Sequence, residues 1–214
     1  MSRVSSQIVT EAPAFSVVAD VVIVKGETPA SDRTWLSFPD GTAHRAAVHV
    51  IHDLPHLVVE SLFGLDDGLW GVLARGGFAT ANKAASRRDP GRAKLVTDAE
   101  FDPLAADTWP AHRVAKAATN AVTNRWQDGP DTPDGVRARL ASSAETGPGP
   151  RGRDKRATLP PDADAADHQR RISELQDRLA DDVIQQAIDG VRRLFEEWSD
   201  LAPGESLRLT WPLS

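Results

Sequence analysis

Residues 172–213 read ISELQDRLADDVIQQAIDGVRRLFEEWSDLAPGESLRLTWPL, and this stretch decides the fold class. Its first part carries an apolar residue every three or four positions, which is typical of one face of an amphipathic helix. This face comprises Ile172, Leu175, Leu179, Val183, Ile184, Ala187, Ile188, Val191, Leu194, Phe195, Trp198 and Leu201. We therefore expect one long continuous helix over 167–200, which ends before Pro203-Gly204.

At the end of the same stretch the spacing of the apolar residues changes. Over 206–213 apolar residues alternate with polar ones, which predicts a strand. Near the other end of the chain, the β-branched run 15–24 predicts a mostly buried strand, and 34–50 predicts a hairpin. Pro39-Asp40-Gly41 forms its turn, because proline presets φ and glycine tolerates left-handed backbone. The fold class is thus α+β, with a small antiparallel sheet (an N-terminal meander plus a C-terminal strand) packed with several helices, including one long C-terminal amphipathic helix.

Two more helices are predicted from starts that contain proline. Asp53 is a good N-cap, and Pro55 follows in the first turn, where the missing N–H costs nothing. Thr108-Trp109-Pro110 repeats this arrangement, so a second helix should begin there. The glycines within 64–68 leave open whether the first helix is one kinked helix or two.

A change in composition divides the chain into three parts. Residues 128–166 interleave prolines and glycines with charges and contain too little apolar surface to offset chain entropy. We expect a flexible linker there, with room for a short helix over 135–143. It joins an α+β core, 1–127, to a C-terminal unit, 167–214, whose helix and strand pack back on the core.

Charge and cysteine content exclude several classes of function. The chain has a formal net charge of -6, which makes nucleic acid an unlikely partner, because such binding requires Lys and Arg to neutralise phosphates. It has no cysteine, which removes disulfides and thiolate chemistry, so a metal would have to bind imidazole or carboxylate groups. No apolar stretch is long enough for a membrane span and no signal peptide is evident, so we expect a soluble cytoplasmic protein.

Histidines and a glutamate near the first helix form the candidate site. His56 and Glu60 are four residues apart, which places them on one helix face, and His52 lies just before the expected N-cap. His112, two residues after Pro110, is like His56 expected in a first helical turn that follows a proline, and the positive end of a helix dipole favours a neutral imidazole there. If the two helix starts face each other, His52, His56, Glu60 and His112 would bind one divalent metal.

Structural roles also explain the same residues. His56 would then be the third helical residue, partnering Asp53 in a capping arrangement, while Glu60 would belong to a solvated face. Two functions follow from these alternatives. The first is a noncatalytic binding or interaction protein, which self-associates or binds a protein partner through the long C-terminal helix. The other is a small metal-dependent enzyme, hydrolytic or oxidative, with a His/Glu site at the start of the first helix.

Overall fold

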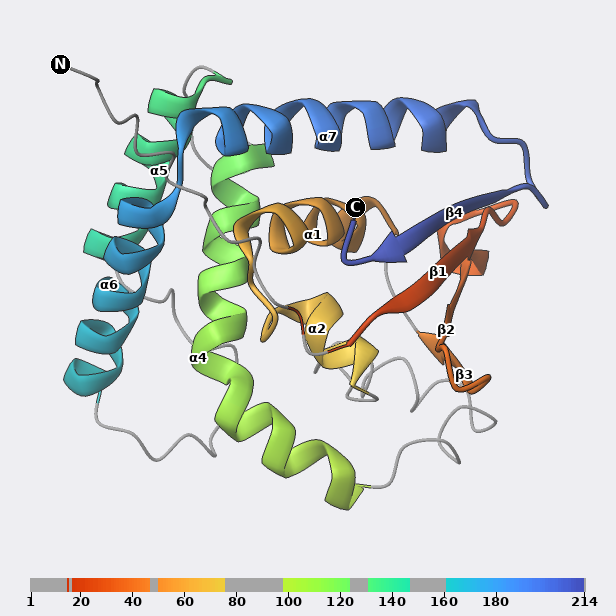
Figure 1. The fold of residues 1–214 in the computed structure, drawn as a ribbon, viewed down its shortest axis with the longest axis horizontal. Helices are drawn as coiled ribbons and strands as arrows, with labels where there is room; N and C mark the ends of the chain where they lie inside the picture. Colours follow the sequence, from red (N-terminus) through yellow and green to blue (C-terminus); the bar gives the residue numbers. More distant parts are fainter. Residues whose placement is uncertain are drawn as a thin grey trace, which may run out of the picture.

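A four-stranded antiparallel sheet forms one side of the protein (Figure 1). The computed structural model describes residues 15, 17–46, 50–75, 98–123, 131–146 and 161–213. The strands are β1 (Ala19–Val24), β2 (Arg33–Ser37), β3 (Ala43–Ala46) and β4 (Ser206–Trp211), in the order β3-β2-β1-β4. The 3-10 turn η1 (Pro29–Ser31) lies between β1 and β2. The predicted meander and returning C-terminal strand are confirmed.

The tight turn between β2 and β3 forms as the sequence predicts. Gly41 has a φ of 84°, a left-handed conformation that L side chains rarely adopt. Asp40 Oδ1 accepts a hydrogen bond from the backbone N–H of Thr42 at 2.9 Å. These two residues therefore fix the register of the hairpin, in which Leu36 lies opposite His44.

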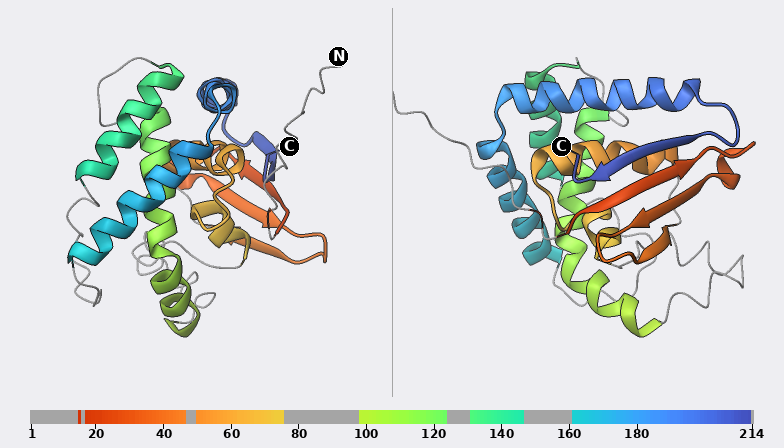
Figure 2. Two further views of the ribbon diagram at one scale, coloured as in Figure 1. Left: turned by 60° about the vertical axis from the view of Figure 1, so that its left-hand side comes forward. Right: turned by 45° about the vertical axis from the view of Figure 1, so that its right-hand side comes forward.

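Six helices are described, and they lie on one side of the sheet (Figure 2). They are α1 (Val50–Phe63), α2 (Leu69–Ala74), α4 (Asp98–Thr123), α5 (Pro133–Thr146), α6 (Pro161–Arg178) and α7 (Asp181–Asp200). No helix within the described ranges is both long enough and apolar enough to cross a membrane. The α+β class is thus confirmed.

α1 is the central helix of the core. It packs against α2, α4 and α7, and every residue from Leu54 to Ser61 is buried. The approach to α7 is close, because a Cβ atom added at Gly190 would lie 2.9 Å from Val58 Cγ1. A helix surrounded in this way buries its polar side chains together with its apolar ones.

α7 confirms the long amphipathic C-terminal helix, but the expected continuation back to residue 167 is wrong. The chain leaves helical geometry at Ala180, where φ is -77° and ψ is 154°. α6 packs on α4 and α5, whereas α7 runs along α1, so the helical path must turn between them. Arg137 of α5 holds this corner, because it donates to Leu179 O at 2.6 Å and contacts Asp181 Oδ1 at 2.7 Å.

The predicted linker also differs from the structure. The short helix expected inside it is present as α5 and is longer than expected, and α6 begins within the same range. Val136 and Leu140 are fully buried, so α5 belongs to the core despite its few apolar residues. The part of the expected linker over 147–160 lies outside the described residues, and the division into three units stays a prediction.

Both proline-based helix starts are wrong. α1 begins at Val50 and contains Pro55, and α4 begins at Asp98, ten residues before Thr108. Burial of Val50 favours the earlier start of α1, because extending the helix removes this side chain from water. The open question at 64–68 is settled: there are two helices, and Gly64 ends the first with a φ of 64°.

Candidate functional site

α1 and α4 bring three of the four predicted site residues together. His56 and Glu60 lie on successive turns of α1, and His56 Nδ1 is 2.9 Å from Glu60 Oε1. The His112 ring, from α4, is stacked on that of His56, with centroids 6.3 Å apart and planes inclined by 6°. His56 thus contacts Glu60 within α1 and stacks on the half-buried His112 of α4.

Glu60 caps the N-terminus of α2. Its Oε1 accepts a hydrogen bond from Leu69 N and its Oε2 accepts one from Trp70 N, both at 2.8 Å. The side chain is fully buried, and the positive end of the α2 backbone dipole stabilises a carboxylate at this place. The expectation that Glu60 belongs to a solvated face is wrong, because neighbouring helices enclose α1.

Gly68 makes room for this cap. It is the N-cap residue of α2, and a Cβ atom at this position would lie 2.3 Å from Glu60 Cδ. Its φ of -76° is open to any residue, so the requirement for glycine here comes from the approach of Glu60. Trp70 also links α2 to the first turn of α1, since its Nε1 donates a hydrogen bond to Asp53 O at 2.8 Å.

The carboxylate also orients the imidazole. A carboxylate only accepts hydrogen bonds, so His56 donates its Nδ1–H to Glu60. This contact fixes the ring plane and directs the second nitrogen, Nε2, away from Glu60. Such carboxylate–imidazole pairs orient histidine ligands at metal sites, and they also occur as structural contacts in protein cores. The capping role expected for His56 is wrong, because it is the seventh residue of α1 and not the third.

The four-ligand metal site remains a prediction. The side chain of His52 lies outside the described residues, although its backbone belongs to α1. Among the side chains that the structure describes, no group of three His, Asp or Glu residues is placed to hold a metal ion. The dipole argument for neutral imidazoles does not apply, because His56 and His112 both lie in helix interiors.

Two arginines, the buried Arg139 and the exposed Arg178, cap the ends of two helices, a role that the sequence did not reveal. Arg139 Nε donates to Ala121 O in the last turn of α4 at 2.6 Å. Burial lowers the pKa of the Arg139 guanidinium, and the nearby charge of Asp131 partly opposes this. Arg178 Nη2 donates to Phe63 O, at the end of α1, at 2.9 Å. These contacts satisfy carbonyl groups that have no partner within their own helix.

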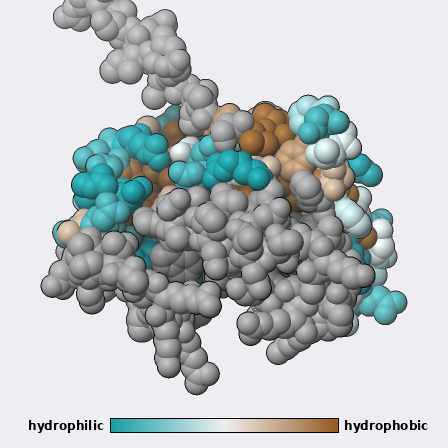
Figure 3. All heavy atoms as spheres, turned by 90° about the horizontal axis from the view of Figure 1, so that it is seen from below, coloured by the Kyte–Doolittle hydropathy of each residue, from teal (hydrophilic) through white to brown (hydrophobic). Residues whose placement is uncertain are grey.

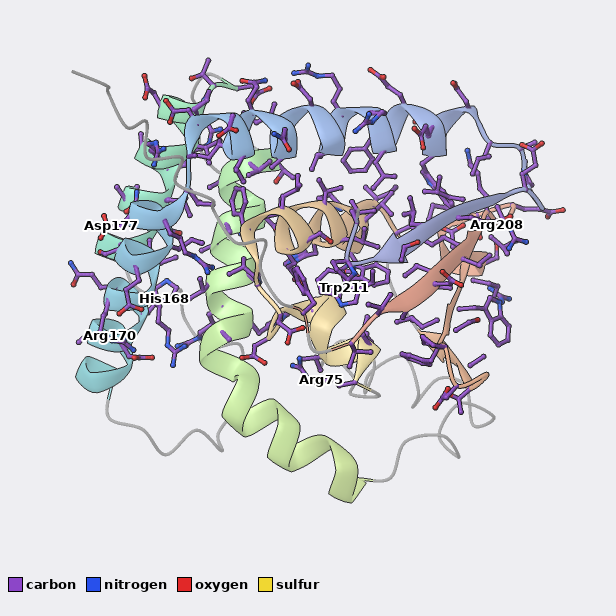
Figure 4. All side chains as sticks on the ribbon, viewed as in Figure 1. Arg75, His168, Arg170, Asp177, Arg208 and Trp211 are labelled. Carbon is purple, nitrogen blue, oxygen red and sulfur yellow. The ribbon has the colours of Figure 1, made fainter. Side chains whose placement is uncertain are left out.

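The face of the sheet away from the helices is a second candidate site. Trp35, on β2, is 43% exposed there, beside the half-buried Val22 of β1. Arg208 of β4 pairs with Val22 in register, and it is exposed whereas its neighbour Leu207 is buried; Figure 4 shows it near the start of β4. Trp211, three residues further along β4, lies on the helix side instead (Figure 4). Strand alternation in 33–37 could have identified this exposed tryptophan.

Figure 3 shows the molecule from below. Hydrophilic residues lie on the left, where α5 and α6 lie in Figure 1, and a hydrophobic group lies right of centre with further hydrophilic residues beyond it. The apolar face of α7 does not contribute an exposed patch, since Leu179, just before the helix, and Ile188 are buried and Phe195 packs partly against the core.

Comparisons with known proteins give no functional information for this chain: no protein-family model, no curated protein and no solved structure matches it.

Proposed function

We propose that this chain is a noncatalytic binding protein, and that the face of its sheet away from the six described helices is the contact surface. The main support for this proposal is the exposed side chain of Trp35, which lies in one row across the sheet with Val22 and Arg208. Tryptophan and arginine are enriched at the energetically important positions of protein interfaces. We call this surface, defined by Val22, Trp35 and Arg208, the open face.

The open face replaces the long helix as the proposed contact. Self-association through α7 would require its buried apolar residues to leave α1, at a cost of roughly 25 cal/mol for each Å² exposed to water. The open face needs no such rearrangement. A cytoplasmic location is part of the same proposal, and the absence of cysteine agrees with it.

Capture experiments with a matched pair of variants test this proposal. Tagged wild-type protein, Trp35→Ala and Arg193→Ala are used as baits in a cell lysate, and sedimentation velocity measures self-association of each. Arg193 is exposed on α7 and serves as the control. We expect at least one bound protein, or a dimer, that Trp35→Ala loses and Arg193→Ala retains. Identical results for all three baits would contradict the proposal.

A metal-dependent enzyme, hydrolytic or oxidative, is the second candidate, and the His56–His112 stack favours it. Glu60 would orient His56, while His56 Nε2 and His112 would provide nitrogen ligands, with His52 as the predicted third. Purified protein is loaded with zinc, manganese or iron, and bound ions are counted against His112→Ala. One ion per chain that the variant loses would support this candidate, and no stoichiometric metal would end it.

A further inference from the structure

We propose that the open face binds a short acidic segment of a partner protein, with an apolar side chain of that segment packed on Trp35. This inference rests on the proposed function and specifies the partner. It follows from the order of residues across the sheet, from their charges, and from the net charge of the whole chain.

Strand register places a cation, an apolar side chain and an aromatic one in a single row. Arg208 on β4 pairs with Val22 on β1, which in turn pairs with Trp35 on β2. Arg45 on β3 pairs with Trp35, so the backbone position of a further arginine continues the row. Neighbouring strands are about 4.8 Å apart, which separates the Arg208 and Trp35 backbones by about 10 Å. An extended segment covers that distance with about three residues.

Among the described side chains of this surface, Arg33 and Arg208 are basic and Asp20 is acidic, which gives a net positive charge. Arg33 lies on the same face of β2, two residues before Trp35. Its guanidinium donates hydrogen bonds to the backbone carbonyls of Ser31 and Asp32. Because carbonyl groups are uncharged, these bonds do not neutralise its positive charge. Asp20, which pairs with Ser37 and Thr210, is the acidic residue that the strand register places on this surface. A second copy of the chain would bring a surface of the same net positive charge against this one. An acidic partner is therefore favoured over self-association.

The length of the ligand decides between an acidic protein segment and a nucleic acid. At physiological salt the Debye length is about 8 Å, so a short ligand senses mainly the arginines beside it. A long polyanion extends beyond the sheet and meets the rest of a chain whose net charge is -6. The same net charge leaves a short acidic segment with only weak repulsion. The observations thus favour a segment of a protein.

Fluorescence anisotropy with defined probes tests the inference on the full chain. The probes are fluorescein-labelled peptides of four Glu-Leu-Gly or four Lys-Leu-Gly repeats, and a fluorescein-labelled uridine dodecamer. We expect the glutamate peptide to bind, and its affinity to fall about tenfold or more in Trp35→Ala and in Arg208→Glu. Arg193→Glu makes the same charge change on α7 and should leave the affinity within about twofold. Higher NaCl should weaken the binding of the glutamate peptide.

Each contrary result has a distinct meaning. Equal losses in Arg208→Glu and Arg193→Glu would show attraction to overall charge and overturn the inference. Tighter, Trp35-dependent binding of the uridine probe or the lysine peptide would overturn the acidic partner but keep the open face as a binding surface. If no probe binds in a Trp35-dependent way and the capture and sedimentation experiments also show no dependence, both the inference and the proposed function fail. Thermal unfolding followed by circular dichroism verifies that each variant folds.

Discussion

At the scale of single residues, Glu60 has the most consequential environment. Its carboxylate accepts from Leu69 N, from Trp70 N and from His56, and so joins two helices through one buried charge. The sequence predicted the proximity of His56 and Glu60 from their spacing. It could not predict their burial, because that depends on packing by α4 and α7, distant in sequence.

Glu60→Gln should lower the free energy of unfolding by about 2–3 kcal/mol. The amide has one accepting oxygen in place of two, so either Leu69 N or Trp70 N would face an NH₂ group. Urea unfolding measures the change. Glu174→Gln, in an exposed pair with Arg170, is the matched control and should have little effect. Equal losses for the two variants would refute the capping role.

Gly68→Ala should destabilise the protein by about 1–3 kcal/mol, because the new methyl group overlaps the Glu60 carboxylate. The cause can be isolated by a double-mutant cycle with Glu60→Ala, which removes the atoms that clash. In that background Gly68→Ala should cost much less, since the φ of Gly68 suits alanine. An unchanged cost in both backgrounds would locate the strain elsewhere.

At the scale of elements, the corner between α6 and α7 shows why periodicity misled the prediction. Leu179 continues the apolar face of both helices, and no glycine or proline marks the break at Ala180. The turn arises from tertiary contacts: α5 supplies Arg137, which donates to Gln176 O and Leu179 O. Apolar spacing predicts a helical face correctly, but it does not report a change of direction.

Arg137→Ala should therefore loosen this corner and lower the free energy of unfolding by about 1–2 kcal/mol. The variant loses bonds to two carbonyl groups and the contact with Asp181. Arg192→Ala, which removes an exposed pair with Asp189, should cost far less. Hydrogen exchange should speed up at amides around 176–184 in Arg137→Ala alone. Unchanged exchange there would show that the corner does not depend on Arg137.

α6 provides a pH-dependent contribution to stability. Hydrogen bonds from Arg171 and Arg170 lower the pKa of Asp167 below its ordinary value. The folded protein therefore gains stability above the ordinary carboxyl pKa of about 3.9, and this gain is lost as the pH falls through the lower folded pKa. Asp167→Asn should be slightly less stable than wild type at pH 7, with the difference fading below about pH 4. A difference that grows on acidification would contradict this assignment.

At the scale of the whole molecule, the sheet and the helices around α1 form one continuous core. The sequence predicted the strands and the α+β class well, because alternation and β-branched runs are local signals. It did not predict that α5 packs on the core, since few α5 residues are large and apolar, yet Val136, Leu140 and Ala144 are buried there. The neighbour of the apolar face of α7, the helix α1, could not be predicted from the sequence, because apolar spacing does not show which element covers a helix.

The substitution Ile188→Ala tests whether α7 is a structural part of the core or a contact surface for another chain. If the helix is a structural part of the core, the change should lower the free energy of unfolding by about 2–4 kcal/mol and leave the sedimentation coefficient unaltered. The exposed Gln186→Ala is the control for the same helix. A variant that keeps its stability but dissociates from an oligomer would restore the long helix as the contact surface.

The pairing of β1 with β4 has a consequence for the order of events during synthesis. β1 is an inner strand of the sheet, yet its partner β4 lies near the other end of the sequence, and Ala19 pairs with Trp211. At ordinary translation rates, on the order of ten seconds or more pass between the appearance of the two strands. During that interval one edge of β1, with Val21 and Ile23, has no strand beside it. A nascent chain is thus most vulnerable to aggregation, and most suited to a chaperone, until its last strand arrives.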